Sequence, residues 1–248
     1  MKYLISALLL HSQCVLPMGD MNCQDGLLKR QIEYYRARAT EYDQWFLRMG
    51  NYDHGKELNE CWFNEVDEVT LAVKRFNPSE EVLELACGTG WWTETLAKYA
   101  DRITAIDASP EVIAINQKKL VGHKEKIIYQ QADLFSWEPD KQYDVIFFSF
   151  WLSHVPADLF EKFWGSVVKA LKPNGRVFFI DSVASSSVHS MPVEHQETQL
   201  RRLSNGQEFE IVKIYYTPDQ LTKKLSELGL KSEINQTERY FLFGSIKS

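Results

Sequence analysis

Apolar and polar positions between residues 78 and 184 follow an order that predicts strands and helices in turn. The runs EVLELAC, RITAIDA, KIIYQQAD, YDVIFFSF and GRVFFIDS have the composition of strands. Helical patterns lie among them over WTETLAKYA, PEVIAINQKKL and ADLFEKFWGSVVKAL. Because several of the strands are apolar without alternation, we expect them to be buried on both faces. The order therefore predicts an α/β fold, with a mostly parallel sheet between helices on both faces.

Ahead of this core, which we place at residues 78–184, residues 27–77 are expected to form a helical cap. The stretch LLKRQIEYYRARATEYDQWFLR has helical composition, with Tyr35, Arg38 and Tyr42 at i, i+3 and i+7. These spacings place the three side chains on one stripe of a helix. A second helical pattern, WFNEVDEVTLAVKRF, ends just before an Asn-Pro pair, where a helix is expected to stop.

Residues 1–26 are interpreted as a leader outside the folded domain. Lys2 and the run YLISALLL resemble the start of a secretory signal, but no small-x-small cleavage site follows them. The apolar run is also too short to span a bilayer, so we expect no stable membrane insertion. A dispensable leader or a mis-assigned start is favoured over export, and we expect a cytoplasmic protein.

The pattern changes in the region of residues 185–216. Here TQLRRLS and QEFEIVKIYY flank Asn205 and Gly206, which is the signal of a β-hairpin with a two-residue turn. We expect this insertion to form a lid or wall on the same domain. Residues 217–248 then predict a helix with Thr217 as its N-cap, followed by two strands that bring the sheet to seven.

Composition indicates one globular domain, residues 27–248. The chain has 248 residues, of which 44% are apolar, and a formal net charge of −6. This length is enough for a core of its own. An acidic balance gives no support to a polyanion-binding surface, so nucleic acid is not the favoured partner. The four cysteines form no CxxC pair, which favours a reducing compartment over a disulfide framework.

The stretch VLELACGTGWWT, residues 82–93, passes from a strand into a helix through a glycine loop. Gly88 and Gly90 leave the backbone amides at the helix N-terminus open to a ligand. A dinucleotide fingerprint has glycine or alanine at the third position, where this chain has Thr93. A phosphate loop ends in Gly-Lys-Ser/Thr, which is absent here. The loop therefore predicts a ligand other than those bound by a dinucleotide fingerprint or a phosphate loop.

Three acidic residues lie at successive strand ends and narrow the choice of ligand. Glu84 precedes the glycine loop, Asp107 ends the next strand, and Asp133 ends the third. The Asp107 carboxylate can accept hydrogen bonds from both hydroxyls of a ribose. The Asp133 carboxylate can accept one from the exocyclic amine of adenine. This set suits an uncharged nucleoside that carries a cationic tail.

With these motifs the chain resembles the class I S-adenosylmethionine-dependent methyltransferases, in particular the small-molecule group that includes ubiquinone and menaquinone C-methyltransferases. The resemblance lies in ELACGTG, ITAIDASPEVI, QQADLF, YDVIFFSFWLSHVP and ALKPNGRVFFID, and it covers about residues 32–183. It implies a Rossmann-like seven-stranded sheet whose last strand is antiparallel. It also implies in-line transfer of a methyl group from S-adenosylmethionine to oxygen, nitrogen or carbon of a small metabolite.

The resemblance further implies which residues bind the cofactor. The methionine part is assigned to the glycine loop and its strand, the ribose and adenine to the ends of the next two strands, and the floor to the residue after the fourth. The stripe on the leading helix resembles a segment that closes over the cofactor, although Arg38 is equally well read as a surface arginine. The assigned residues are Tyr35, Arg38, Tyr42, Glu84, Ala86, Gly88, Gly90, Asp107, Ala108, Asp133, Leu134 and Phe150.

A candidate general base is His154, in FWLSHVP directly after the fourth strand. Imidazole titrates near neutrality, and this position lies at the carboxyl edge of the sheet, where ligands bind. The alternative is a structural histidine that caps the next helix or holds the following loop. His189 and His195 lie in the insertion and are weaker candidates. Together with Glu194 they are not expected to bind metal, because the strand ends lack a clear acidic triplet.

Three other functions remain open at this point. Methylation of RNA or protein is one, although the segment after the fourth strand reads SFWL rather than the NPPY-like motif of base amination. A module that binds S-adenosylmethionine without catalysis is the second. A hydride-transferring enzyme is the third, on the analogy of fold alone.

Overall fold

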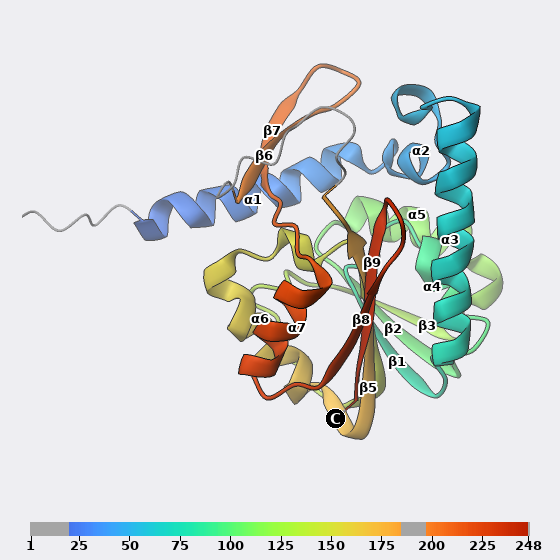
Figure 1. Ribbon diagram of the computed structural model, residues 1–248, viewed down its shortest axis with the longest axis vertical. Coiled ribbons are helices and arrows are strands. Elements are labelled where there is room, and N and C mark those ends of the chain that lie inside the picture. Colours follow the sequence, from blue (N-terminus) through green and yellow to red (C-terminus); the bar gives the residue numbers. More distant parts are fainter. Residues whose placement is uncertain (1–19, 185–196, 248) are drawn as a thin grey trace, which may run out of the picture.

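The computed structural model describes residues 20–184 and 197–247 of the chain and centres on one seven-stranded sheet (Figure 1). Its strand order is β3-β2-β1-β4-β5-β9-β8. Only β9 runs antiparallel to its neighbours, which confirms the predicted sheet with one antiparallel last strand. The strands are β1 (Glu81–Leu85), β2 (Arg102–Asp107), β3 (Ile127–Gln131), β4 (Tyr143–Ser149), β5 (Leu171–Ser182), β8 (Ser232–Gln236) and β9 (Phe241–Lys247).

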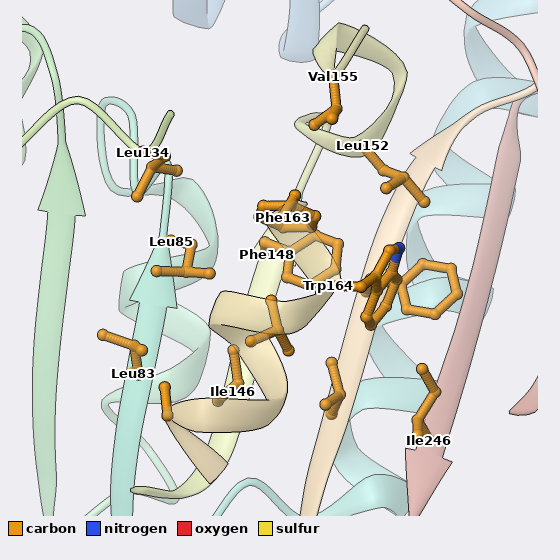
Figure 2. Packing of buried hydrophobic residues seen from close by; sticks show 14 of the residues in the cluster. Leu83, Leu85, Leu134, Ile146, Phe148, Leu152, Val155, Phe163, Trp164 and Ile246 are labelled. Carbon is orange, nitrogen blue, oxygen red and sulfur yellow. The ribbon is translucent and has the colours of Figure 1, made fainter. Parts of the chain in front are cut away.

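Strands β1 and β4 lie at the centre and are buried on both faces, as their unbroken apolar runs predict. Successive side chains of a strand point to opposite faces, so these two strands supply two separate cores. Ile146 and Phe148 face Phe163 and Trp164 of α6 (Phe160–Lys169) (Figure 2). Phe147, between them in sequence, belongs to the core on the other face, with α3 (Lys56–Phe76) and α4 (Trp91–Leu96).

Helices cover both faces of the sheet (Figure 1). Thr217 caps α7 (Pro218–Glu227) as predicted and forms a capping box with Gln220, and at the start of α5 (Pro110–Lys119) Ser109 Oγ accepts the Val112 N–H. The helices over the two faces are α3 (Lys56–Phe76), α4 (Trp91–Leu96), α5 (Pro110–Lys119), α6 (Phe160–Lys169) and α7 (Pro218–Glu227), with short 3-10 turns at η1 (Gly50–Tyr52), η2 (Val121–His123), η3 (Leu152–His154) and η4 (Ala157–Leu159).

The leading segment is divided into two helices, α1 (Asp20–Arg38) and α2 (Tyr42–Phe46), where the sequence predicts one. After the break, α2 turns toward the glycine loop, and Asp43 accepts hydrogen bonds from the Thr89 hydroxyl at 2.5 Å and the Lys119 ammonium at 2.8 Å. Helical periodicity alone gives no sign of this tertiary anchor. Helix α1 also begins inside the predicted leader of residues 1–26, whose first nineteen residues lie outside the described ranges.

The predicted hairpin is present as β6 (Thr198–Arg202) and β7 (Glu208–Val212), beside α1 (Figure 1). Its turn differs from the two-residue turn that the Asn-Gly pair predicts. The Gly206 N–H donates to the Leu203 carbonyl, the Leu203 N–H donates to the Gln207 carbonyl, and Gly206 has φ +87°. These bonds define a three-residue turn with a glycine bulge, which accepts the same residue types. Among the described helices, none is both long and apolar enough to cross a membrane.

Candidate active site

A cavity opens at the carboxyl ends of β1, β2 and β4, beneath α1 and α2. It also has His154 in its wall. Nine of the twelve predicted cofactor residues line it: Tyr35, Tyr42, Ala86, Gly88, Asp107, Ala108, Asp133, Leu134 and Phe150. The other three, Arg38, Glu84 and Gly90, lie behind this lining.

The loop requires glycine at positions 88 and 90 for different reasons. Gly88 has φ +53°, and a Cβ added there would meet nothing within 4 Å, so the backbone faces open space in the cavity. Gly90 has φ +92°, and an added Cβ would lie 2.5 Å from the side-chain oxygen of Asn116 on α5. Gly88 therefore leaves room for a ligand, whereas Gly90 lets the helices pack.

Asp107 ties the glycine loop to the end of β2. Its Oδ2 accepts the Gly88 N–H and its Oδ1 accepts the Ser109 N–H, both at 2.9 Å. Burial raises the pKa of this carboxyl, although the two amides oppose the shift. Each carboxylate oxygen retains a further lone pair, so Asp107 can hold the loop and accept hydrogen bonds from a ligand.

Glu84 is buried behind the loop with 1% of its surface exposed. Its Oε2 has no hydrogen-bond partner among the described residues. Burial raises the pKa of Glu84 to about 8, with the nearby Asp107 charge adding to the shift and Thr93 opposing it. A buried carboxyl with one oxygen left without a partner is costly to ionise, and an arriving cation lowers that cost. This oxygen of Glu84 and the open space at Gly88 fit the cationic donor that the sequence predicts.

The far wall of the cavity is formed by the segment after β3. Asp133 Oδ1 accepts the Phe135 N–H at 3.0 Å, which holds the carboxylate beside the buried Leu134. Phe150 follows β4 with φ +51°, and its ring centroid lies 4.9 Å from that of Trp45 in the cap. A flat apolar space between Leu134 and an acid suits a heterocyclic base.

His154 is buried, and both of its ring nitrogens are engaged. Nδ1 lies 2.6 Å from the Val212 carbonyl oxygen, which only accepts, so Nδ1 carries the hydrogen. Nε2 therefore accepts, and the Tyr35 hydroxyl donates to it at 2.7 Å. Burial, with Lys213 and two arginines nearby, lowers the pKa of His154 well below its ordinary range. The imidazole is neutral at pH 7, and among the described residues the Tyr35 hydroxyl is the group bonded to its Nε2.

Gln31 completes this contact between α1, η3 and the hairpin. Its amide nitrogen donates to the His154 carbonyl at 3.2 Å, and its amide oxygen accepts the Val212 N–H at 3.0 Å. Burial raises the pKa of Tyr35 well above its ordinary value, so the phenol remains protonated. Three segments distant in sequence thus hold one tyrosine hydroxyl at the cavity wall.

Arg38 turns away from the lining and into the tyrosines of the cap. Its guanidinium lies 5.0 Å from the ring centroid of Tyr42 and donates to the Tyr52 hydroxyl at 3.2 Å. Its Nε is buried without a partner among the described residues. Arg38 is therefore not a plain surface arginine, and its charge lies close behind the cavity.

Sequence reasoning missed seven residues of the lining. Gln31 and Ile32 lie one helical turn before Tyr35, so the periodicity of α1 could have predicted them. Ser149 and Trp151 flank Phe150, so their place at the end of β4 could have predicted them as well. The missed residues are Gln31, Ile32, Ser109, Val112, Phe135, Ser149 and Trp151. His189, Glu194 and His195 lie outside the described residues.

Comparison with known proteins agrees with this geometry. A family model described as a methyltransferase domain matches residues 82–175. The ubiquinone biosynthesis O-methyltransferase of Stutzerimonas stutzeri is 26% identical over 170 residues, which are 66% of this chain and 68% of the relative. A malonyl-[acyl-carrier protein] O-methyltransferase of Serratia marcescens is 27% identical over 161 residues, 63% of this chain and 58% of its own.

Two solved structures are similar over most of the chain. The DhpI-SAM-HEP complex is 35% identical with a TM-score of 0.76, covering 90% of this chain and 98% of that one. The DhpI-SAH complex is 37% identical with a TM-score of 0.74, covering 90% and 97%. The chain therefore belongs to the class I S-adenosylmethionine-dependent methyltransferases, as an enzyme of the small-molecule group with S-adenosylmethionine as its methyl donor.

Proposed function

We propose that this enzyme methylates an oxygen atom of a small acceptor that contacts Tyr35 at the cavity wall. Bound S-adenosylmethionine supplies an electrophilic methyl group on its sulfonium sulfur. The observation that carries the proposal is the 2.7 Å hydrogen bond from the Tyr35 hydroxyl to Nε2 of a neutral His154. The O-methyltransferases among the similar proteins support oxygen as the atom methylated.

The donor's site is proposed to follow the charges at the sheet edge. Glu84 faces the amino group of the methionine part, and the open backbone at Gly88 gives that part its room. Asp107 holds the ribose hydroxyls, while Asp133 and Leu134 hold the adenine. Ala86, Ala108, Phe150 and Tyr42 shape the remaining walls, Gly90 acts through packing, and Arg38 acts through its charge behind the lining.

In-line displacement needs the acceptor oxygen fixed on the side of the methyl group opposite the sulfur. Positioning of this kind supplies up to about 7–11 kcal/mol of the barrier in well-oriented reactions. The Tyr35 hydroxyl, held from behind by His154, contacts the acceptor and fixes its oxygen. If that oxygen belongs to a hydroxyl, its proton passes to the Tyr35 oxygen as the tyrosine proton moves to His154 Nε2.

We also propose that the protein works in the cytoplasm and that residues 27–248 act as one domain. The acceptor is not a nucleic acid, because a net charge of −6 gives no attraction to a polyanion. These proposals are tested by fractionation of the native host and by adding RNA to the transfer assay, where no label should enter the RNA.

The experiment combines S-adenosylmethionine carrying an isotopically labelled methyl group with metabolite extracts and follows the labelled product by mass spectrometry. Tyr35→Phe keeps the ring but removes the hydroxyl, so we expect turnover to fall at least tenfold. The matched control is Tyr34→Phe, because that ring packs on Phe209 of the hairpin instead. Cofactor affinity, from isothermal titration, should stay within about twofold in both. Unchanged turnover in Tyr35→Phe would remove the tyrosine from the mechanism.

A further inference from the structure

We propose that the acceptor carries an oxyanion, a carboxylate or a phosphoryl group, and that Lys213 and Arg201 on the hairpin segment bind it. The inference rests on the proposed function, since it describes the acceptor of that same site. The oxyanion is the group that anchors the acceptor, whereas the oxygen that is methylated contacts the Tyr35–His154 pair.

Lys213 lies directly beside this pair. It follows Val212, whose carbonyl accepts from His154, and its Nζ donates at 2.7 Å to Oγ of Ser153, the residue before His154. The lysine side chain is only 6% exposed. An ammonium has three hydrogens to donate, and Ser153 is its one hydrogen-bond partner among the described residues.

The carboxylate nearest to Lys213 is shared with other donors. Asp181 Oδ1 lies 3.6 Å from the lysine Nζ, which is longer than a hydrogen bond. Its oxygens also accept the backbone N–H groups of Ser153 at 2.8 Å and Ser182 at 2.7 Å. Asp181 therefore neutralises the ammonium in part and leaves donor capacity for a ligand.

Arg201 adds a second cation to the same side of the cavity. It pairs across the hairpin with Phe209, whose ring lies 5.7 Å from that of Tyr34 on α1. From there its charge acts on Tyr35, His154 and Lys213. Within residues 20–184 and 197–247, no ion pair includes Arg201 or Arg38. The charges of Lys213, Arg201 and Arg38 thus all act on His154, and Asp181 forms the ion pair with Lys213.

Positive charge gathered around the buried Lys213 is unfavourable unless an anion joins it. Burial lowers the pKa of Lys213 to about 8, Asp181 opposes the shift, and the Arg201 charge adds to it. The loss of water makes each charge more expensive and each opposite charge more valuable. An oxyanion placed against Lys213 and Arg201 restores the balance and receives charge-assisted hydrogen bonds. The alternative is a purely structural Lys213–Asp181 pair, which needs no ligand.

The test is isothermal titration of inorganic phosphate, and separately of acetate, into the full chain saturated with S-adenosylhomocysteine. Sodium chloride of equal ionic strength is the blank. We expect saturable binding of at least one probe that weakens tenfold or more in Lys213→Met and in Arg201→Gln. The matched control is Arg202→Gln, since the neighbouring Arg202 side chain is 72% exposed and should leave binding unchanged. The tighter probe identifies the phosphoryl or the carboxylate source.

The proposal is overturned if neither probe saturates, or if both variants bind as the wild type does. Should Lys213→Met fail to fold in a thermal melt, Arg201→Gln decides the outcome. The proposed function fails separately, through unchanged turnover in Tyr35→Phe. If the two variants lose probe binding while Tyr35→Phe remains fully active, the oxyanion site is supported and the proposed contact between Tyr35 and the acceptor is wrong.

Discussion

The two halves of the cavity are built in opposite ways. The half beneath the glycine loop consists of backbone and of acids at the ends of consecutive strands, with Asp107 and Asp133 in the lining and Glu84 behind it. The half beneath the hairpin consists of side chains from distant segments, and the cations nearest to it, Lys213 and Arg201, lie behind its lining. Under the two proposals above, the first half receives the cationic donor and the second the anionic acceptor, so that charge would distinguish the two ligands.

The largest expected effect is a difference in stability between alanine substitutions at the two glycines of the donor half. Gly90→Ala combines a left-handed backbone with a Cβ 2.5 Å from Asn116, so unfolding free energy should fall by about 2–4 kcal/mol. Gly88→Ala carries only the backbone strain, about 1–2 kcal/mol, because its Cβ meets nothing. Its methyl group projects into the space left for the ligand and should weaken cofactor binding instead. Urea melts and titration calorimetry measure both, and equal stability losses would contradict the distinction.

A second, smaller effect is expected at the end of β2. Asp107→Ala removes an acceptor for the ribose and the anchor of the Gly88 amide, so cofactor affinity should fall by about 1.5–3 kcal/mol. Asp181→Asn is the matched change in the acceptor half and should leave cofactor affinity within about twofold. Unaltered affinity in Asp107→Ala would mean that the ribose binds elsewhere.

The third prediction concerns the protons released when the cofactor binds. With a pKa near 8, Glu84 is protonated at pH 7 in the free enzyme, and an ammonium against it lowers that pKa. Cofactor binding at pH 7 should therefore release up to about one proton, seen as a calorimetric enthalpy that depends on the buffer. Glu84→Gln has no carboxyl to titrate at that position and should release none. A buffer-independent enthalpy in the wild type would contradict the assignment.

The same group sets a pH dependence of stability. Its folded pKa exceeds the ordinary value of 4.5, so the free enzyme binds more protons than the unfolded chain between these limits. The contribution of Glu84 is fully present below about pH 4.5 and is lost as the pH rises to about 8. Melts across this window should show the loss in the wild type and its absence in Glu84→Gln.

The strands and helices of the core were predictable because each has its own period and the caps are local. Thr217 and Ser109 begin helices through bonds to residues three positions away. Seven of the nine predicted residues that line the cavity also follow from their strand ends, since parallel strands bring those ends to one edge. Sequence position does not show which atoms face the cavity, so Glu84, Gly90 and Arg38 were not separated from the lining.

The acceptor half was much less predictable for a physical reason. His154 is engaged by Tyr35, 119 positions earlier, and by Val212, 58 positions later. Lys213 lies against Ser153 and Asp181, neither of which is its neighbour in sequence. No local period encodes such packing. The sequence could name His154 as a candidate base but could not show that the Tyr35 hydroxyl is bonded to its Nε2.

The most direct measurement is a crossed titration, in which S-adenosylhomocysteine and inorganic phosphate are each titrated into Asp107→Ala and Lys213→Met. If the halves are separate and opposite in charge, Asp107→Ala weakens only the nucleoside ligand and Lys213→Met weakens only phosphate, each tenfold or more. If either variant instead weakens both ligands alike, or if the two losses are exchanged, the division of the cavity is wrong.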